Sequence, residues 1–431
     1  MNITEIGRAL RRGAISAGEL ADTAIRRTRE LNPTLNAFAL IDDQGAAAAA
    51  RAADEQLAAG IDLGPLHGVP VAVKDLIDLA GLPTTCGSAA SFGGIATEDA
   101  EVVRRLREAG AVIIGKTTLH EFAYGATGDR SVHGASRNPH DPSRMSGGSS
   151  GGSAVAVAAG MVPLALGTDT AGSVRVPAAL CGVVGFKPAY DAISSAGVYP
   201  LAPSLDHVGV FAATSEDALI GYRALSDIAP PAAAGEHPSV GWIPSIAATD
   251  SRIEKLTREL VNRVFDVEVV DGFSKWELFE AFSALQGKEA FEVHKHHLAA
   301  DEDLIDPEVL ARLHKGRAIS DRRYAQAEIV RDELLVKVGE LLSIYDVLAL
   351  PTVPFVAPPI GDRSVSVDGT DLEVRSALLS LTSPWNMTGS PAISVPAGRL
   401  DGLPIAVQLV TAPGNEALLF AAARALETTK Y

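Results

Sequence analysis

The sequence predicts an α/β fold, an α/β/α sandwich around a large mixed, mostly parallel β-sheet. Short β-branched runs, Val69–Val73 and Ala111–Ile114, alternate with stretches of helical pattern. Such alternation is typical of a sheet that is covered by helices. A charged region of helical period spans about 250–342, and strand-like runs then return at Asp346–Leu350, Ala392–Val395 and Ile405–Leu409. We therefore expect one sheet that is interrupted in sequence by a helical region.

Local signals place the expected helices. Ser16 can cap a helix N-terminus, and Glu19 three residues later completes a capping box. Gly45–Leu57 is rich in alanine, the residue with the highest helix propensity. Further helices are expected at Asp99–Ala109, before the second strand, and at Glu416–Glu427, near the C-terminus.

Composition narrows the class of protein. The 431 residues could form two or three domains of average size or one large α/β domain, with Ile228–Gly235 as a surface connection. Hydrophobic residues make up 47% and charged residues 21%, which indicates a soluble protein with a large core. The two cysteines, Cys86 and Cys181, are expected to be reduced core residues because each sits in an apolar stretch.

Charge and hydropathy argue against two kinds of partner. The formal charge of −16, without a Lys/Arg run, argues against nucleic-acid binding. No charge-free apolar stretch reaches the roughly 18 residues that a membrane helix needs. The N-terminus also lacks the apolar core of a signal peptide. We therefore expect a cytoplasmic protein without membrane contact.

Two small-residue turns are the most informative feature for function. Ser146–Ser153 reads Ser-Gly-Gly-Ser-Ser-Gly-Gly-Ser, and Gly167–Ser173 reads Gly-Thr-Asp-Thr-Ala-Gly-Ser. Glycines around a serine let main-chain N–H groups approach a ligand or a hydroxyl. A flexible linker is the alternative, but linkers join polar segments, whereas these turns flank the uncharged run Ala154–Leu166. We expect a polar reaction centre inside an apolar core.

Three other motifs favour structural interpretations. Gly110–Thr117 matches the phosphate-loop pattern, but its strand lies inside the motif instead of before it. Gly148–Gly152 matches a nucleophile elbow, but it follows a loop-like segment. The histidines of Glu292–His297 share a polar helical stretch with Lys295 and have no partnering cysteines. We expect them to form a solvated helix face and not a zinc site.

Three charged residues adjoin the turns and the first strand. Asp169 and Arg175 flank the second turn, where a buried ion pair is the simpler interpretation and substrate contact the alternative. Lys74 ends the strand Val69–Val73, so its amine faces the core. Burial favours the neutral amine, which can act as a base near neutral pH. Most strand-end lysines, in contrast, only reach back to solvent.

Taken together, these segments resemble the amidase signature family of amide hydrolases. The resemblance is carried by Gly64–Asp75, Gly115–Phe122, Arg137–Pro139, Gly147–Ser153, Gly167–Pro177 and Gly185–Pro188. It recurs at Asn386–Pro396 and Gly402–Leu409 and is absent between about 235 and 340. It implies one domain, 1–431, with the amidase signature fold and a more variable helical region at about 235–340.

The resemblance implies hydrolysis of a carbon–nitrogen bond by a Ser–cis-Ser–Lys triad. Lys74 would be the base, Ser149 the bridging serine after a cis peptide bond, and Ser173 the nucleophile that forms an acyl-enzyme. The oxyanion hole would consist of main-chain N–H groups of Thr170, Ala171, Gly172 and Ser173. Neither a cofactor nor a metal is implied.

Substrate contacts are expected outside the triad. The resemblance places Tyr124, Gly125 and Met145 in the substrate pocket. Substrate choice is expected to depend also on the 235–340 helices, the Tyr124–Thr127 loop and the region Trp385–Met387. Two positions depart from the family pattern: Ala171 replaces a usual glycine, and Ala189–Ala192 replaces a common Thr-x-Gly-Arg. The alanine methyl could narrow the pocket.

Three functions compete. The first is hydrolysis of a small amide, or of a related carbamate or urea, by a protein that could form a homodimer. The second is the glutaminase subunit of a tRNA-dependent amidotransferase, which would need partner subunits. The third is a catalytically silent binding protein, against which the complete triad argues.

Overall fold

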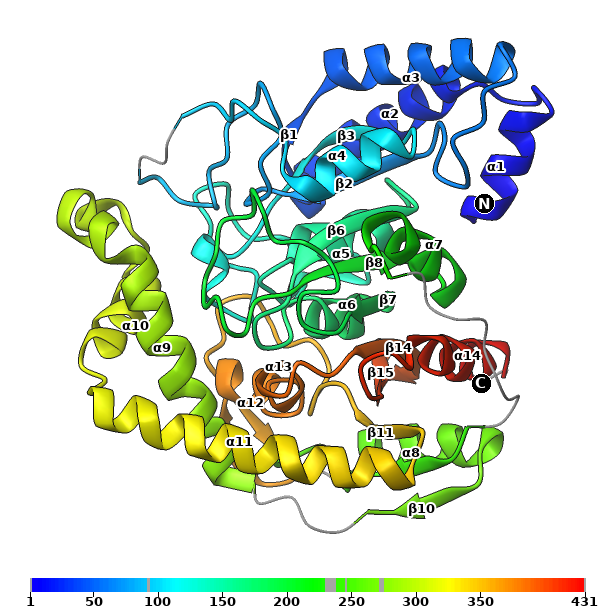
Figure 1. The fold of residues 1–431 in the computed structure, drawn as a ribbon. Coiled ribbons are helices and arrows are strands. Elements are labelled where there is room, and N and C mark those ends of the chain that lie inside the picture. The colour runs from blue at the N-terminus through cyan, green and yellow to red at the C-terminus, as the bar shows by residue number, and fades with distance from the viewer. Residues whose placement is uncertain (1, 91–93, 229–237, 245, 271–274, 430–431) are drawn as a thin grey trace.

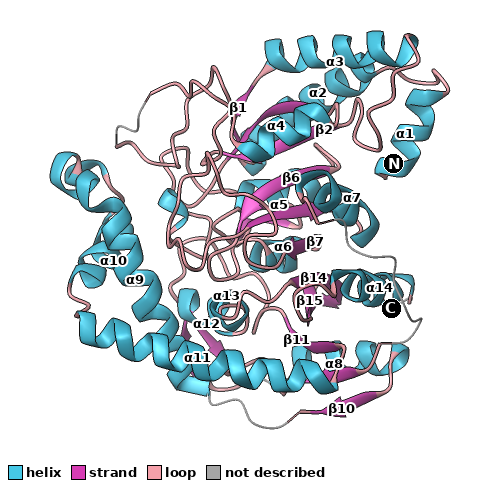
Figure 2. Ribbon diagram, viewed as in Figure 1, coloured by secondary structure: helices cyan, strands magenta, loops and turns pink. Residues whose placement is uncertain are grey.

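Helices cover both faces of an 11-stranded mixed sheet (Figure 1), so the predicted α/β sandwich is confirmed. The alternation of helices and strands along the chain is visible when the ribbon is coloured by secondary structure (Figure 2). The structure, a computed structural model, describes residues 2–90, 94–228, 238–244, 246–270 and 275–429. The predicted connection Ile228–Gly235 therefore lies, apart from Ile228, outside the described residues.

The large sheet has the strand order β1-β3-β2-β6-β8-β7-β14-β15-β11-β9-β10. These strands are β1 Phe38–Ile41, β2 Pro70–Lys74, β3 Val112–Thr117, β6 Leu164–Thr168, β7 Val184–Lys187, β8 Val208–Ala212, β9 Val240–Trp242, β10 Val267–Val269, β11 Val347–Pro351, β14 Ala392–Leu400 and β15 Leu403–Val410. Two small antiparallel pairs lie outside it: β4 Arg137–Asn138 with β5 Asp141–Met145, and β12 Ser364–Val367 with β13 Thr370–Glu373.

Strand direction changes along the sheet. β3, β2 and β6 are parallel near one end, and β11, β9 and β10 are parallel at the other. From β6 to β11 through the middle, every neighbouring pair is antiparallel. The expected parallel strands thus belong to the two ends. Within the middle, β14 and β15 form a tight hairpin through Asp401–Gly402, and both of these residues have positive φ, as such a turn requires.

The helices occupy the intervals between strands. The α-helices are α1 Ile3–Arg11, α2 Ala17–Leu35, α3 Asp43–Ala58, α4 Glu101–Glu108, α5 Gly151–Ala158, α6 Arg175–Cys181, α7 Ser215–Leu225, α8 Ser251–Val264, α9 Lys275–Ala300, α10 Pro307–Arg317, α11 Asp321–Ile344, α12 Val374–Ser380, α13 Pro384–Met387 and α14 Glu416–Thr428. Two 3-10 turns occur at Glu121–Ala123 and Glu302–Leu304. None of the helices in the described ranges combines the length and apolarity that a bilayer span requires.

The local predictions agree with these bounds. Ser16 caps α2 by accepting the Glu19 N–H at 3.0 Å, and Glu19 accepts the Ser16 N–H at 2.9 Å, so the capping box is confirmed. Each of the five expected strands overlaps a strand of the sheet. The region 250–342 is mainly helical, as predicted, but it also contains the short strand β10. Both cysteines are buried and free.

Alternate residues of β7 explain how the two helical layers fit onto the sheet. Gly185 leaves room for Ala178 of α6, since a Cβ at this position would overlap the Ala178 side chain. Phe186 points to the opposite face, because successive side chains of a strand alternate. Its ring lies 4.9 Å from that of Tyr222 on α7 and 4.7 Å from that of Phe420 on α14. β7 therefore packs against helices on both faces of the sheet.

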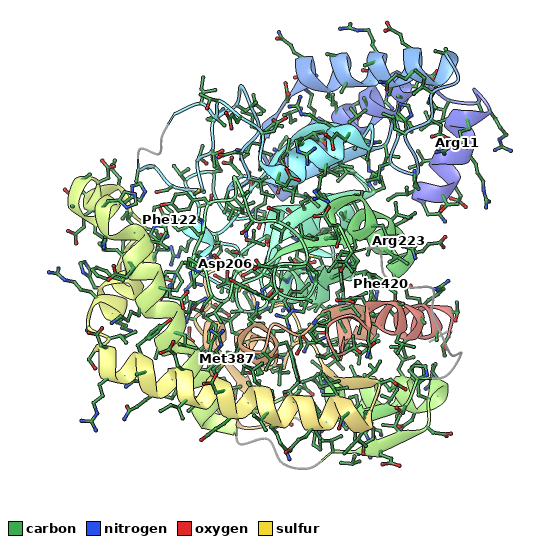
Figure 3. The ribbon with its side chains drawn as sticks, viewed as in Figure 1. Arg11, Phe122, Asp206, Arg223, Met387 and Phe420 are labelled. Atoms are coloured by element: carbon green, nitrogen blue, oxygen red, sulfur yellow. The ribbon has the colours of Figure 1, made fainter. Side chains whose placement is uncertain are left out.

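An arm of helices lies beside the sandwich. α9 packs against both α10 and α11, which run along the left and lower edges of the view (Figure 1). The segments that carry Phe122, Asp206 and Met387 lie between these helices and the strands (Figure 3). The functional residues predicted from the sequence belong to this loop-rich side.

We expect Phe186→Ala to destabilise the fold by about 3–5 kcal/mol, because it removes a fully buried ring and leaves a cavity. The measurement is the denaturant midpoint followed by tryptophan fluorescence. Ile329→Ala on α11, where the side chain is 58% exposed, is the control and should change the midpoint little. Equal midpoints for the two variants would contradict the assignment of Phe186 to the core.

Candidate active site

The predicted catalytic residues come from three neighbouring segments. Lys74 is the last residue of β2, Ser149 directly precedes the turn into α5, and Ser173 lies between β6 and α6. β2 and β6 are parallel neighbours, so both strands end at the same edge of the sheet. That edge is where α/β sheets usually bind ligands. Lys74 and Ser149 are fully buried and Ser173 is 5% exposed.

The Lys74 amine faces hydroxyls instead of a carboxylate. Its Nζ donates to Ser149 Oγ at 2.7 Å and to Thr168 Oγ1 at 2.8 Å. Burial lowers the pKa of Lys74 to about 7, although the charges of Asp206 and Asp169 act in the opposite direction. A substantial fraction of the amine is therefore neutral near neutral pH and can accept a proton.

The two serines are held together through the main chain. The Gly148–Ser149 peptide bond is cis, as the resemblance implied. The Ser150 N–H donates to the Ser173 carbonyl at 3.3 Å, and the His120 N–H donates to the Ser149 carbonyl at 3.0 Å. The Ser173 hydroxyl makes no hydrogen bond to a described residue, so the Ser149–Ser173 contact of the expected relay is not formed in this structure.

Asp169 organises the turn that carries Ser173. Its carboxylate accepts the Gly172 N–H at 2.7 Å and the Val174 N–H at 3.1 Å. Burial alone would raise the pKa of Asp169, but the guanidinium of Arg175 outweighs burial and holds the pKa well below its usual value. Both side chains are fully buried and lie 2.8 Å apart. The buried structural ion pair is confirmed.

Arg175 extends this network to the C-terminal part of the chain. It donates to the Thr382 carbonyl at 2.9 Å, to Gln408 Oε1 at 2.6 Å and to Asn386 Oδ1 at 2.6 Å. Asn386 in turn donates to Asp169 Oδ1 at 2.9 Å. Asn386, which lies in a region expected to select the substrate, is thus engaged in supporting the turn.

One expected oxyanion donor is already occupied. The Gly172 N–H points at Asp169, so it is not available to a substrate oxygen, and the expectation for Gly172 is revised. The N–H groups of Thr170, Ala171 and Ser173 form no hydrogen bond with the described part of the chain. These three remain the candidate donors.

The backbone of the turn explains which of its residues must be glycine. Gly172 has a φ of +134°, and a Cβ there would collide with Thr382. Ala171 does not occur among the described non-glycine residues with positive φ. Its methyl is therefore compatible with the local backbone, and its effect on the width of the pocket stays a prediction.

Asp206 is a nearby carboxylate that sequence reasoning missed. It is half-buried, accepts the Thr170 hydroxyl at 2.6 Å and accepts the N–H groups of Leu201 and Ala202. Burial raises the pKa of Asp206 to about 6, although these hydrogen bonds favour its charged form. The signal available in the sequence was a single acidic residue two positions before the apolar strand β8.

The expected substrate-pocket residues are all buried. Tyr124 lies under two arginines, Arg312 of α10 and Arg375 of α12. Gly125 adjoins the His120 ring, where a Cβ would collide. Met145, at the end of β5, packs in a separate part of the core and is held through its main chain by Pro358. Neither arginine was singled out from the sequence.

The histidine stretch of α9 corrects one expectation. His294 and His297 are buried, whereas His296 is exposed, so this side of the helix is not solvated as expected. The reason is that α9 lies against the site loops, with the His294 ring 4.4 Å from the Phe122 ring. Burial lowers the pKa of His294 to about 3. Within the described ranges, no group of His, Cys, Asp and Glu side chains could hold a metal ion.

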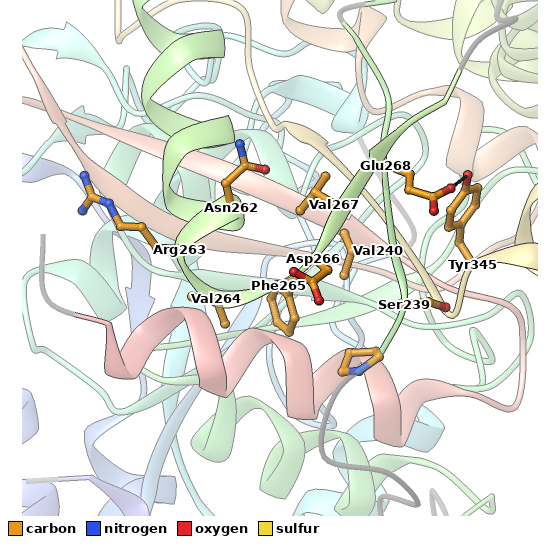
Figure 4. Close-up of a pocket in the computed structure, with 11 residues that line it drawn as sticks. Ser239, Val240, Asn262, Arg263, Val264, Phe265, Asp266, Val267, Glu268 and Tyr345 are labelled. Atoms are coloured by element: carbon orange, nitrogen blue, oxygen red, sulfur yellow. Dashed lines mark hydrogen bonds between the residues drawn. The ribbon is translucent and has the colours of Figure 1, made fainter.

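A cavity of about 660 Å³ lies elsewhere (Figure 4), at the edge of the sheet formed by β9 and β10. Its lining includes the C-terminal end of α8 and the hydrogen-bonded pair Tyr345 and Glu268, at 2.9 Å. None of the predicted catalytic residues lines it. It therefore does not compete with the strand-end site as the reaction centre.

Comparison with known proteins agrees with this geometry. The profile of the family described as Amidase matches residues 19–239 and 246–420. The AtzE subunit of the 1-carboxybiuret hydrolase of Pseudomonas sp. (strain ADP) is 35% identical, with coverage of 100% of this chain and 98% of that protein. The GatA-type chain of the glutamyl-tRNA(Gln) amidotransferase of Symbiobacterium thermophilum (strain DSM 24528 / JCM 14929 / IAM 14863 / T) is 34% identical, with coverage of 96% and 93%.

A solved structure shows the same fold. A crystal structure described as an amidase superposes with a TM-score of 0.94 at 34% identity, and 99% of each chain is covered. The family profile, the relatives and the structural match all extend over nearly the whole chain. The protein therefore belongs to the amidase family, whose members are enzymes that act on carbon–nitrogen bonds.

Proposed function

We propose that the protein hydrolyses a small amide, or a related carbamate or urea, through an acyl-enzyme on Ser173. The observation that carries this proposal is the buried hydrogen bond of 2.7 Å between Lys74 Nζ and Ser149 Oγ. It supports a base role for Lys74, because its pKa of about 7 suits proton transfer near neutral pH. Ser149 and Ser173 are the remaining members of the proposed triad.

The proposed reaction moves one proton along the triad and back. Neutral Lys74 accepts the proton of Ser149, and Ser149 accepts the proton of Ser173 as the Ser173 oxygen attacks the carbonyl carbon. The tetrahedral intermediate collapses when the carbon–nitrogen bond breaks. Ser149 gives its proton to the leaving nitrogen, and Lys74 returns its proton to Ser149. A water molecule, activated by the same relay, then cleaves the ester and restores Ser173.

Three main-chain groups are proposed to stabilise the charged intermediate. The N–H groups of Thr170, Ala171 and Ser173 are not engaged within the described chain and belong to the turn that carries the nucleophile. One such donor contributes roughly 3 kcal/mol in other enzymes. Asp169 supports them indirectly, since it holds the Gly172 and Val174 N–H groups and so sets the shape of the turn.

A glutaminase component of an amidotransferase is the second candidate. The observation in its favour is the similarity to the glutamyl-tRNA(Gln) amidotransferase chain over 96% of this protein. Such a role would require partner proteins, whereas a free-standing amidase would release ammonia or amine by itself. Assaying the isolated protein with glutamine and with small amides distinguishes the two. The expected homodimer and the cytoplasmic location stay predictions.

Ser173→Ala should abolish hydrolysis and covalent labelling. Because the nucleophile is lost, we expect kcat/KM to fall by at least about a thousandfold. The measurements are amine or ammonia release across a panel of small amides and intact-mass detection of a fluorophosphonate adduct. Ser153→Ala is the matched control, since Ser153 is a buried serine whose hydroxyl is engaged with Leu166 and Thr117. A Ser173→Ala protein that still acquires the adduct would refute the assignment of the nucleophile.

Activity should rise with pH up to about 7 and then level off. Because the active form of Lys74 is neutral, protonation below its pKa of about 7 removes the base. We expect kcat/KM to fall about tenfold per pH unit on the acid side. The measurement is a pH profile between pH 5 and 9, with circular dichroism to show that the fold persists.

Asp206→Asn should move the acid side of the kcat/KM pH profile to lower pH. The charge of Asp206 favours protonated Lys74, so its removal lowers the pKa of the lysine. Asp371→Asn, an exposed change on β13, should leave the acid side in place. A shift to higher pH in Asp206→Asn would contradict the proposed coupling.

A further inference from the structure

Two arginines share one aromatic ring beside the reaction centre. The guanidinium carbon of Arg312 lies 5.5 Å from the centre of the Tyr124 ring, and that of Arg375 lies 5.6 Å from it. The two arginines come from different helices, α10 and α12, and Tyr124 comes from the loop after β3. Two like charges are thus held near each other although they repel.

Both arginines have donors without an acceptor. The Nε atoms of Arg312 and Arg375 are buried and make no hydrogen bond. Arg312 donates from Nη2 to His120 at 3.3 Å, and Arg375 donates from Nη2 to Gln286 at 3.0 Å. A buried donor without a partner costs stability, and for a charged group the cost is larger. Such a cost is understandable if a ligand supplies the missing acceptor.

The nearby carboxylates do not neutralise this pair. Arg375 forms no salt bridge in the described part of the chain, and Arg312 only approaches Glu308 at 4.0 Å. Glu308 is occupied by Arg130 and by Arg363, whose Nε lies 3.0 Å from it. Asp129 likewise pairs with Arg363, at 2.9 Å.

The remaining charged groups around α10 are also engaged or neutral. Asp306 caps α10 by accepting the Glu308 and Val309 N–H groups, and Glu121 accepts the Asp306 N–H at 2.7 Å. Burial and the charge of Arg312 lower the pKa of His120. Burial and the charge of Arg375 lower the pKa of Arg312 to about 10, so the Arg312 guanidinium still carries its charge at neutral pH.

The arginine pair is connected at three points to the segments that carry the proposed triad. His120 accepts from Arg312 through its side chain, while its main-chain N–H holds the Ser149 carbonyl. Arg375 belongs to α12, and Thr382, two residues beyond this helix, donates its hydroxyl to the Ala171 carbonyl. Gly125, next to Tyr124, has its carbonyl against Gly148. These contacts connect the arginine pair to the segments that carry Ser149 and Ser173.

We propose that the substrate carries a carboxylate and that Arg312 and Arg375 bind this group while the amide carbonyl lies at Ser173. The planar guanidinium forks match the two oxygens of a carboxylate, and hydrogen bonds between charged groups are the stronger ones. The inference rests on the proposed amide hydrolysis for its placement at Ser173, but its anion site can be tested without turnover. Stacking on Tyr124 accounts for the position of the guanidiniums but leaves the buried Nε donors unexplained.

The first experiment compares amides that differ only in charge. Malonamate, succinamate and glutaramate are each assayed against the corresponding neutral diamide, and the ratio of kcat/KM values is recorded. The wild-type ratio should favour at least one monocarboxylate. In Arg312→Gln and Arg375→Gln the ratio should fall by about 10- to 100-fold, because a charge-assisted contact to the carboxylate is lost. Arg317→Gln, an exposed change on the same helix as Arg312, is the control and should keep the wild-type ratio.

A second experiment measures binding without catalysis. Malonate, succinate and glutarate at constant ionic strength should raise the melting temperature of the wild-type protein, with sodium chloride as the reference. Arg312→Gln and Arg375→Gln should lose this shift, and Arg317→Gln should retain it. Circular dichroism of each variant before heating shows whether it is folded, and Arg375→Lys, which keeps a charge, should restore part of the shift.

The outcomes separate this inference from the proposed function. Hydrolysis of the diamides without any preference for a carboxylate would overturn the inference and leave the amidase proposal standing. An unchanged ratio in both arginine variants would overturn it as well. If none of the amides is hydrolysed, the change in melting temperature caused by the dicarboxylates decides. A rise that is lost only in the two arginine variants supports the anion site. No rise in the wild-type protein overturns the inference.

Discussion

The buried carboxylate of Asp169 is the constraint on which the reaction centre depends. It accepts the N–H groups of Gly172 and Val174 and pairs with Arg175, and neither side chain of this pair is exposed. A charge in such a place is tolerated only when its acceptor sites are filled and its charge is balanced. The same contacts bend the chain so that the N–H groups on either side of Gly172 stay unengaged. Loss of one partner would leave a bare charge in the core, so the turn and the ion pair depend on each other.

Burial alone does not make a lysine a base, as two other lysines of the sheet show. Lys116 of β3 is fully buried, but its Nζ lies 2.8 Å from the carboxylate of Asp75, which has no proton to give. Burial lowers the pKa of Lys187 at the end of β7, but its Nζ faces the Pro188 carbonyl, which has no proton to give. Lys74 differs because its partners are the hydroxyls of Ser149 and Thr168. A neutral amine that faces a hydroxyl can receive a proton, and this combination occurs at β2.

Interactions between residues close in sequence were predictable, and those between distant residues were not. The Ser16 and Glu19 cap involves neighbours in one helical turn, so its residue types are sufficient evidence. Lys74 and Ser149 are 75 positions apart, and only the resemblance to a family placed them together. Arg312 and Arg375 were not singled out, because no local pattern shows that other helices will cover them. The antiparallel middle of the sheet was missed for a related reason, since strand direction depends on connections and not on strand composition.

The proposed reaction chemistry and the proposed substrate recognition rest on different parts of the chain. The turn with Ser173 is held inside the sandwich by Asp169 and Arg175, whereas Arg312 comes from α10, in the arm beside it. The two parts meet where His120 contacts both Ser149 and Arg312. Thr382, which follows α12, contacts Ala171 of the turn. In the proposed mechanism, changes in the arm therefore alter which substrate is held without touching the proton relay. A change that displaces His120 is different, because the same residue holds the carbonyl of the bridging serine.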